Sequence, residues 1–302
     1  MRISTNVLLT ILLLRFSLVA QQSSLPQPQL DIPSVSSQAE AGEIGAMVQL
    51  GRAYFYGKGA PADVEQGRIW LDRAADKGSI DAEMLLGMAY FSGVKLPKNR
   101  ALAAKYLLKV AQQPVVEQEF QSSQALARYF TGMMYRYGDG LEKSDKNALD
   151  FFQLAADQGS VPAQYDLAVM YDNGIGTPAD KTRACQLYET AADAGHIAAM
   201  NNAGYCSQQG IGCVKDDSKA IAYYTKAADA GHSKAQNNLA ILYGGLEQWE
   251  RSYFWLRVAE LSGAVEDTPA IGRVKAHLTS AQIDTTEKEA LRWSETHKQK
   301  RD

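Results

Sequence analysis

The sequence has no marked excess of basic residues. Its 302 residues include 31 Lys and Arg against 34 Asp and Glu, so the net charge at pH 7 is −3. Proteins that bind nucleic acid usually carry a basic face or stripe, because contacts with phosphates dominate their affinity. The only basic cluster is the terminal stretch 298–301, which is typical of a solvated tail. The composition therefore gives no support for a nucleic-acid partner.

The chain also lacks an apolar run long enough to cross a membrane. Its most apolar stretch, Val7–Leu14, is followed by Arg15, whereas a membrane-spanning helix needs about 20 apolar residues. Together with Arg2 before it and the small Ala20 after it, this stretch has the pattern of a secretory signal peptide. We therefore expect a periplasmic or secreted protein, cleaved near Ala20, with no stable membrane span after the signal is removed. If the stretch is instead a buried N-terminal helix, the protein is cytoplasmic.

Cysteine is scarce, and none occurs in the first half of the chain. The three cysteines are Cys185, Cys206 and Cys213, which argues against the lipid-anchored start of a bacterial lipoprotein. In an exported protein cysteines favour a disulfide, and three residues allow three pairings with one thiol left over. We favour a disulfide between Cys206 and Cys213, because both lie in one predicted local hairpin. The alternative is three buried thiols that act as small apolar side chains.

What the sequence does contain is an internal repeat. The string AADAGH occupies residues 191–196 and recurs 36 residues later at 227–232. A second landmark, a small residue usually followed three positions later by tyrosine, advances by the same 36 residues except for one step of 45, from Gly87 to Gly132. Fixed self-similarity at this period is the signature of a stacked repeat array. These landmark positions are Gly51, Gly87, Gly132, Ala168, Gly204 and Ala240.

Each repeat predicts two helices. Ala, Leu, Gly and Tyr at helical spacing place one apolar stripe on a first helix, and a Gly-x-Gly turn such as 57–59 ends it. A second helix carries paired bulky residues and two alanines, and it stops at a glycine such as Gly78. In four repeats an aspartate stands where we expect it to cap the second helix, namely Asp63, Asp145, Asp180 and Asp216.

The repeat unit resembles a known family. The pattern, clearest in NNAGYCSQQGIGCVKDDSKAIAYYTKAADAG at 201–231, looks like the Sel-1-like repeat, a relative of the tetratricopeptide repeat. The resemblance implies an all-α fold, a right-handed superhelical solenoid of about six antiparallel helix pairs with a C-terminal capping helix. It also implies a scaffold or adaptor that binds other proteins. Two copies depart from the pattern: in the second, Lys95 replaces the second turn glycine, and the sixth is about four residues shorter.

These patterns divide the chain into four segments: a signal peptide at 1–20, a flexible linker rich in Gln, Ser and Pro at 21–41, the repeat solenoid at 42–264, and a C-terminal helical cap and tail at 265–302. Thr279 with Gln282 predicts a capping box for the last helix. A repeat array needs a terminal unit with a polar outer face, and we expect the last segment to supply it.

The sequence contains no evident catalytic, metal or cofactor site. His196 and His232 occupy one repeat position after a helix-ending glycine, and no pair of histidines has the spacing of metal ligands on a helix. The Gly-x-Gly turns are too short to hold phosphate and precede acidic helix starts. Ser92 and Lys95 match the serine–lysine motif of penicillin-recognising enzymes, but the partner motifs are absent. We expect a non-enzymatic protein without cofactor, and the alternative is a periplasmic hydrolase that uses Ser92 and Lys95.

First helices line the concave surface of tetratricopeptide-like solenoids, which indicates where a partner would bind. Residues three before, one after and four after each landmark share one helix face, distinct from the apolar stripe. Met, aromatic and amide side chains on such a face suit a groove for a protein or peptide, and the alternative is that they pack in the core. We therefore expect an exported scaffold with a protein or peptide partner. Its partner-binding residues, here named the concave stripe, are Met84, Met88, Phe91, Tyr129, Met133, Arg136, Tyr165, Val169, Asp172, Asn201, Tyr205, Gln208, Asn237 and Ile241.

Overall fold

The computed structural model describes residues 30–114, 117–263 and 268–298. Within these ranges every regular element is a helix, and none of the described helices has the length and apolar composition that a membrane crossing requires. The predicted signal peptide at 1–20 lies outside the described residues. The chain divides into two compact units, one up to Ser144 and one from Asp145 onward, and each is described by itself.

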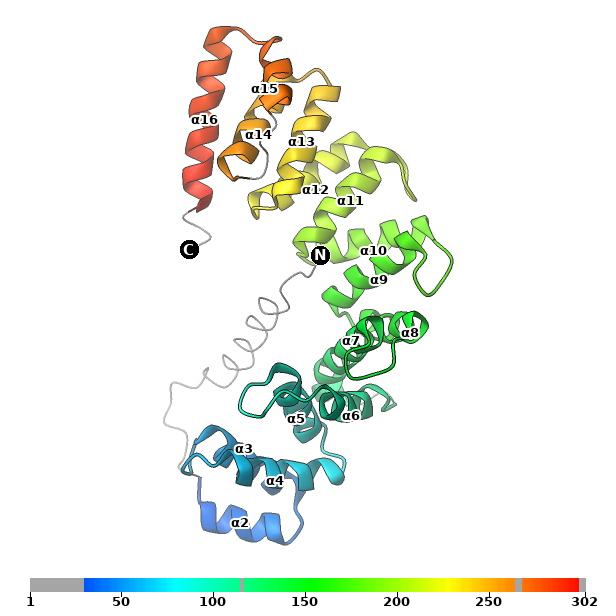
Figure 1. Cartoon of the computed structure of the whole chain (residues 1–302), viewed down its shortest axis with the longest axis vertical. Coiled ribbons are helices and arrows are strands. Elements are labelled where there is room, and N and C mark those ends of the chain that lie inside the picture. Colours follow the sequence, from blue (N-terminus) through cyan, green and yellow to red (C-terminus); the bar gives the residue numbers. More distant parts are fainter. Residues whose placement is uncertain (1–29, 115–116, 264–267, 299–302) are drawn as a thin grey trace. The chain divides into compact units, whose positions relative to one another are not determined.

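The first unit is a series of helices that pack in chain order. α3 packs against α4 and α5 against α6 as repeat pairs, and α4 with α5 and α6 with α7 join successive repeats. Figure 1 labels these helices. Their bounds are α2 (Ile32–Glu40), α3 (Ile44–Tyr56), α4 (Val64–Asp76), α5 (Ile80–Ser92), α6 (Arg100–Ala111), the short 3-10 helix η1 (Gln118–Phe120) and α7 (Gln121–Tyr137).

The second unit continues the same alternation and ends in two further helices. Each helix from α8 to α14 packs against a chain neighbour, and α15 and α16 both pack on α14. The bounds are α8 (Asp145–Asp157), α9 (Val161–Asn173), α10 (Lys181–Asp193), α11 (Ile197–Gln209), α12 (Asp217–Asp229), α13 (Ser233–Gly245), α14 (Trp249–Leu261), α15 (Thr268–Lys275) and α16 (Ser280–Lys298). The predicted all-α solenoid of about six helix pairs with a terminal helix is confirmed, and its right-handed winding stays a prediction.

The ends of the helices follow the local signals in the sequence, with one correction. The carboxylate of Asp63 accepts the N–H of Gln66 at 3.0 Å and so caps α4, and Asp180 and Asp216 cap α10 and α12 in the same way. Asp145 does not occupy this position, because it is the first helical residue of α8. The corresponding position, six residues after the helix-ending glycine, belongs to Ser144.

Landmark glycines let the two helices of a repeat approach closely. A Cβ atom added at Gly204 on α11 would lie 2.7 Å from the Tyr224 ring on α12, and one at Gly51 on α3 would lie 2.8 Å from Leu71 on α4. Carbon atoms in contact are normally about 3.5–4.0 Å apart. The landmark residue is therefore small because a larger side chain would collide with the bulky, buried residue of the second helix.

The predicted flexible linker at 21–41 is partly helical, because α2 occupies Ile32–Glu40. The Asp31 carboxylate accepts the N–H of Ser34 at 3.4 Å, and Pro33 lies in the first turn, where its missing N–H costs nothing. Val35 and Ala39, four residues apart on one helix face, are buried, and α2 packs against α3. The Ser, Gln and Pro content suggested a tether, but two apolar residues at helical spacing are enough to dock this segment.

The C-terminal segment forms the predicted helical cap. Thr279 and Gln282 make the expected capping box: the Thr279 N–H donates to Gln282 Oε1 at 2.9 Å, and the Gln282 N–H donates to Thr279 Oγ1 at 3.4 Å. Tyr253 on α14 is buried and donates its hydroxyl to Glu287 Oε1 on α16 at 2.5 Å. The Trp255 and Trp293 rings meet edge to face with centroids 5.5 Å apart. The cap thus covers the apolar side of the last repeat helix.

Candidate partner-binding surface and C-terminal pocket

Part of the concave stripe belongs to the core. Met84, Phe91, Tyr129 and Asn201 are buried, so the prediction that they line an accessible surface is wrong. The Phe91 ring on α5 packs against Phe130 on α7 with centroids 4.9 Å apart. First helices of consecutive repeats thus contact each other, α5 with α7 and α11 with α13. This contact helps to bury Phe91, which lies four residues after its landmark.

One position of the stripe is exposed in two consecutive repeats of the second unit. The residue directly after the landmark is Val169 on α9, Tyr205 on α11 and Ile241 on α13. Val169 is half-buried, whereas Tyr205 is 48% and Ile241 59% exposed. We name these three residues the apolar row, because they occupy the same position of consecutive repeats. The corresponding residues of the first unit are Arg52, which is exposed, and Met88 and Met133, which are half-buried.

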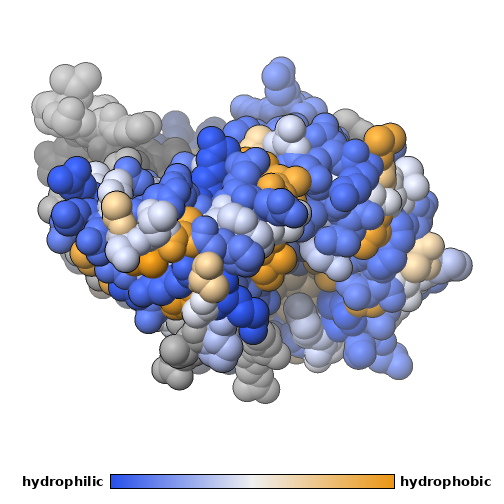
Figure 2. Space-filling model, turned by 90° about the horizontal axis from the view of Figure 1, so that it is seen from above, coloured by the Kyte–Doolittle hydropathy of each residue, from blue (hydrophilic) through white to orange (hydrophobic). Residues whose placement is uncertain are grey.

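Large apolar side chains are also exposed elsewhere, for example Tyr137 at 71% and Val214 at 87%. On the face shown in Figure 2 hydrophilic residues predominate, and apolar residues form separate small patches among them. Isolated exposed apolar residues are common in soluble proteins, whereas aligned ones indicate an interaction surface. The alignment of the apolar row with the repeat is therefore the informative feature.

Other stripe residues near the apolar row are engaged within the second unit. Gln208 Oε1 accepts a hydrogen bond from the Tyr224 hydroxyl at 2.9 Å. Asp172 forms an ion pair with Lys181 at 2.6 Å. These contacts reduce the capacity of both side chains to bind a partner. The remaining stripe residues, all half-buried, are Arg136, Tyr165 and Asn237.

The two histidines of the repeated string are N-caps of the following helices. His196 Nδ1 accepts the N–H of Ala199 at 3.2 Å, and His232 Nδ1 accepts that of Ala235 at 3.3 Å. Burial lowers the pKa of both imidazoles, which keeps Nδ1 unprotonated and able to accept. Their shared repeat position indicated a structural role, but not the cap, because histidine is not one of the usual capping residues.

The three cysteines lie together as free thiols in the second unit. Cys185 on α10 lies next to Cys206, near the end of α11, and to Cys213, in the loop that follows. The contact with Cys206 raises the pKa of Cys185, and burial raises the pKa of Cys213 to about 12. The predicted disulfide between Cys206 and Cys213 is absent. Cys185 belongs to a different helix, and only the packing of α10 on α11 brings it to the same place.

Ser92 and Lys95 have the geometry of a helix end. Ser92 Oγ donates to the carbonyl oxygen of Met88 at 2.8 Å and accepts the N–H of Val94 at 3.2 Å. Lys95 has a left-handed backbone, with φ of 71°, at the position where other repeats carry the second turn glycine, and its side chain is exposed. Both residues therefore have local structural explanations.

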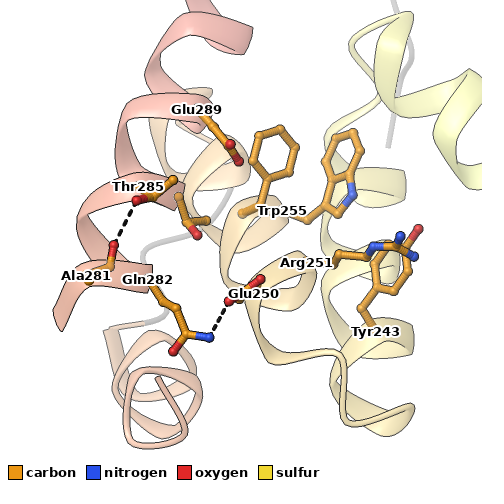
Figure 3. A pocket seen from close by; sticks show the side chains of 10 residues that line it. Tyr243, Glu250, Arg251, Trp255, Ala281, Gln282, Thr285 and Glu289 are labelled. Carbon is orange, nitrogen blue, oxygen red and sulfur yellow. Dashed lines mark hydrogen bonds between the residues drawn. The ribbon is translucent and has the colours of Figure 1, made fainter. Parts of the chain in front are cut away.

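The second unit also contains a pocket between α14 and α16 that the sequence did not predict (Figure 3). Its volume is about 560 Å³. Gln282 on α16 donates a hydrogen bond to Glu250 on α14, and the Arg251 guanidinium lies over the Tyr243 ring at 5.4 Å. No sequence pattern indicated which face of α14 would meet α16. The lining residues are Tyr243, Glu250, Arg251, Phe254, Trp255, Ala281, Gln282, Thr285, Thr286 and Glu289.

Comparisons with known proteins agree with this architecture. The chain is similar to a protective antigen of uropathogenic Escherichia coli strains that displays an SLR fold, with 28% identity and a TM-score of 0.66 over 88% of this chain and 56% of that one. It therefore spans little more than half the length of that protein. A Sel1 repeat protein from Oxalobacter formigenes is 25% identical, with a TM-score of 0.55 over 72% of this chain and 89% of that one. No curated protein was found to match.

The family model for the Sel1 repeat matches six consecutive segments, and together they take up more than half of the chain. They are residues 44–79, 80–114, 125–160, 161–196, 197–232 and 233–259. The resemblance noted in the repeat pattern is thereby confirmed. The chain belongs to the Sel1 repeat family.

Proposed function

We propose that this Sel1 repeat protein is an exported adaptor without enzymatic activity that binds a protein or peptide on the first helices of its second unit. Sel1 repeat proteins are typically protein-interaction scaffolds. The observation that carries the proposal is the apolar row, in which Tyr205 and Ile241 are exposed at the same position of consecutive repeats. Aligned apolar side chains that no neighbouring helix covers are best explained by a partner that covers them.

The chemistry of the row suits an extended peptide. Tyr205 offers a large, rigid ring and a hydroxyl that can donate or accept a hydrogen bond. Asn237 lies four residues before Ile241 on α13, so the two side chains share one helix face. Its amide can pair with both the N–H and the C=O of a bound main chain. An apolar contact beside an amide is therefore available in one repeat.

The proposal is tested by placing a photo-crosslinking residue at Tyr205 or Ile241 in living cells. We expect a discrete crosslinked partner from both positions and none from a control at Val214, which is 87% exposed in the neighbouring loop. Tyr205→Ala should weaken binding of that partner by about 10-fold or more without lowering the melting temperature. Equal crosslinking at Val214, or no product at either row position, would contradict the proposal.

A separate experiment addresses export. Fractionation of the cells and N-terminal sequencing of the mature protein should place a chain that begins near residue 21 outside the cytoplasm. An uncleaved chain in the cytoplasm would mean that the adaptor is cytoplasmic and not exported. The proposed binding surface would be unaffected.

A further inference from the structure

A cluster of potential metal ligands lies where the fourth and fifth repeats meet. The sulfur atoms of Cys185 and Cys213 and a carboxylate oxygen of Glu189 all lie within 4.8 Å of one another. Cys185 and Glu189 are one helical turn apart on α10, with 3.6 Å between Sγ and Oε1. Cys213 comes from the loop between α11 and α12. Cys206 on α11 lies next to Cys185 and adds a third thiol near this set, although its sulfur is not one of the atoms within 4.8 Å of one another.

The repeat provides an internal control for this cluster. At the position of Cys206, two residues after the landmark, the other repeats carry Ala53, Ala89, Met134, Met170 and Leu242. At the position of Cys213 they carry Ala60, Leu96, Leu141 and Thr177, and at that of Cys185, Arg68, Ala104, Leu149 and Ile221. The repeat fold is therefore built without cysteine at any of the three positions. Repeat packing does not explain why all three thiols converge at one join.

The dimensions and the donor types fit a thiophilic metal ion. In tetrahedral zinc sites the Zn–S distance is about 2.3 Å and the Zn–O distance about 2.1 Å, so that ligand atoms stand about 3.5–3.8 Å apart. The ligand atoms already lie within 4.8 Å of one another. Side-chain rotations that move these atoms by about 1 Å bring them to that separation. Thiolate-rich sites select zinc and similar soft ions over magnesium or calcium.

We propose that Cys185, Glu189 and Cys213, with Cys206 as the additional thiolate, form a binding site for a Zn²⁺-type ion that joins two consecutive repeats. Two ligands come from the second helix of one repeat and two from the next repeat, so the ion cross-links the join. Cys213 is only half-buried, which gives an ion a way in from solvent. Binding requires deprotonated thiols and so releases protons.

A lysine competes with the proposed ion for its carboxylate ligand. Lys219 Nζ on α12 lies 2.7 Å from Glu189 Oε1, and both side chains are partly exposed. The ammonium group supplies a positive charge next to the place where the ion would bind. Removal of this charge should strengthen metal binding if the thiols are ligands. If the thiols only pack as small apolar side chains, its removal should not strengthen metal binding.

The test is titration of the reduced full-length protein with Co²⁺, followed by competition with Zn²⁺. We expect one Co²⁺ per chain with thiolate-to-cobalt charge-transfer absorption. Cys185→Ser and Cys213→Ser should weaken binding by at least about 10-fold, and Glu189→Gln should weaken it less. Lys219→Met should tighten it by about 3- to 10-fold. The exposed Glu142 provides a control, because Glu142→Gln should leave binding unchanged.

Two readouts guard against loss of the fold and against oxidation. The melting temperature of each variant without metal shows whether the variant is folded. The gain in metal affinity expected for Lys219→Met does not depend on a cysteine substitution. Absence of charge-transfer absorption, or equal affinity in the wild type and both cysteine variants, would overturn the proposal. A disulfide among these cysteines in the mature protein, isolated from cells without reductant, would also overturn it, because it would consume the ligands.

Discussion

His196 and Tyr165 stack in the second unit, with ring centroids 4.4 Å apart and 24° between the ring planes. Tyr165 lies on α9 and His196 at the start of α11, so the contact joins consecutive first helices. The same imidazole caps α11 through Nδ1. A protonated ring cannot accept that N–H, and this couples the join between repeats to pH.

The histidine caps predict a pH dependence of stability. Burial lowers the pKa of His196 in the folded state below the ordinary 6.5, so the unfolded chain binds its proton first as the pH falls. The contribution is therefore fully present above the unfolded pKa and is lost as the pH falls below it. His196→Asn should keep the cap and remove this dependence, whereas His196→Ala should cost about 1 kcal/mol at neutral pH.

Urea unfolding of the wild type and His196→Asn at about pH 7.5 and pH 5 measures the effect as a difference. Carboxylates that also titrate in this range contribute equally to both proteins, so their contributions cancel in that difference. A gap between the two proteins that is the same at both pH values would contradict the coupling.

The close approach of α11 and α12 predicts a large effect of a single methyl group. Gly204→Ala should destabilise the fold by about 1–3 kcal/mol, because the new Cβ would press on the Tyr224 ring. Gly245→Ala near the end of α13 is the matched control, since nothing lies within 4 Å of its added Cβ. Chemical denaturation of both variants should separate them. Similar free energies of unfolding would mean that the landmark is not under steric constraint.

Deletion of residues 268–302 should expose the apolar side of α14. The deletion removes the Glu287 carboxylate bonded to Tyr253 and the Trp293 ring that packs on Trp255. We expect the melting temperature to fall by at least about 4 °C and binding of an apolar dye to rise. Deletion of 299–302 alone serves as the control and should change neither. Equal melting of the two truncated chains would argue against the capping role.

Ser92 is expected to contribute to a helix end and not to catalysis. Its hydroxyl bonds the carbonyl oxygen of Met88, so Ser92→Ala should cost about 0.5–1.5 kcal/mol of stability. Incubation with a chromogenic β-lactam should show no turnover above the rate without protein. Turnover that the wild type has and Ser92→Ala loses would restore the hydrolase hypothesis.

Local signals in the sequence were sufficient for the repeat architecture. The 36-residue period, the helix-ending glycines and the caps at Asp63, Asp180 and Asp216 act within a few residues along the chain. The cap predicted at Asp145 is wrong by one position, since an aspartate beside a serine leaves two neighbouring candidates for the cap. For α2 the polar composition predicted a flexible linker. The segment is helical instead, because two buried residues pack it onto the repeats.

The sequence by itself determined which segments of the repeats are helices and how they pair, because helix propensity, capping and turn geometry depend on near neighbours in the chain. Only the tertiary structure decided which side of each first helix remains accessible. Phe91 and Tyr205 both belong to the predicted stripe, yet Phe91 is covered by Phe130 of the next repeat and Tyr205 remains exposed. It also decided that Cys213 lies beside Cys185 and Glu189. These outcomes depend on the angle and register at which one helix pair packs on the next, and a single repeat does not encode them.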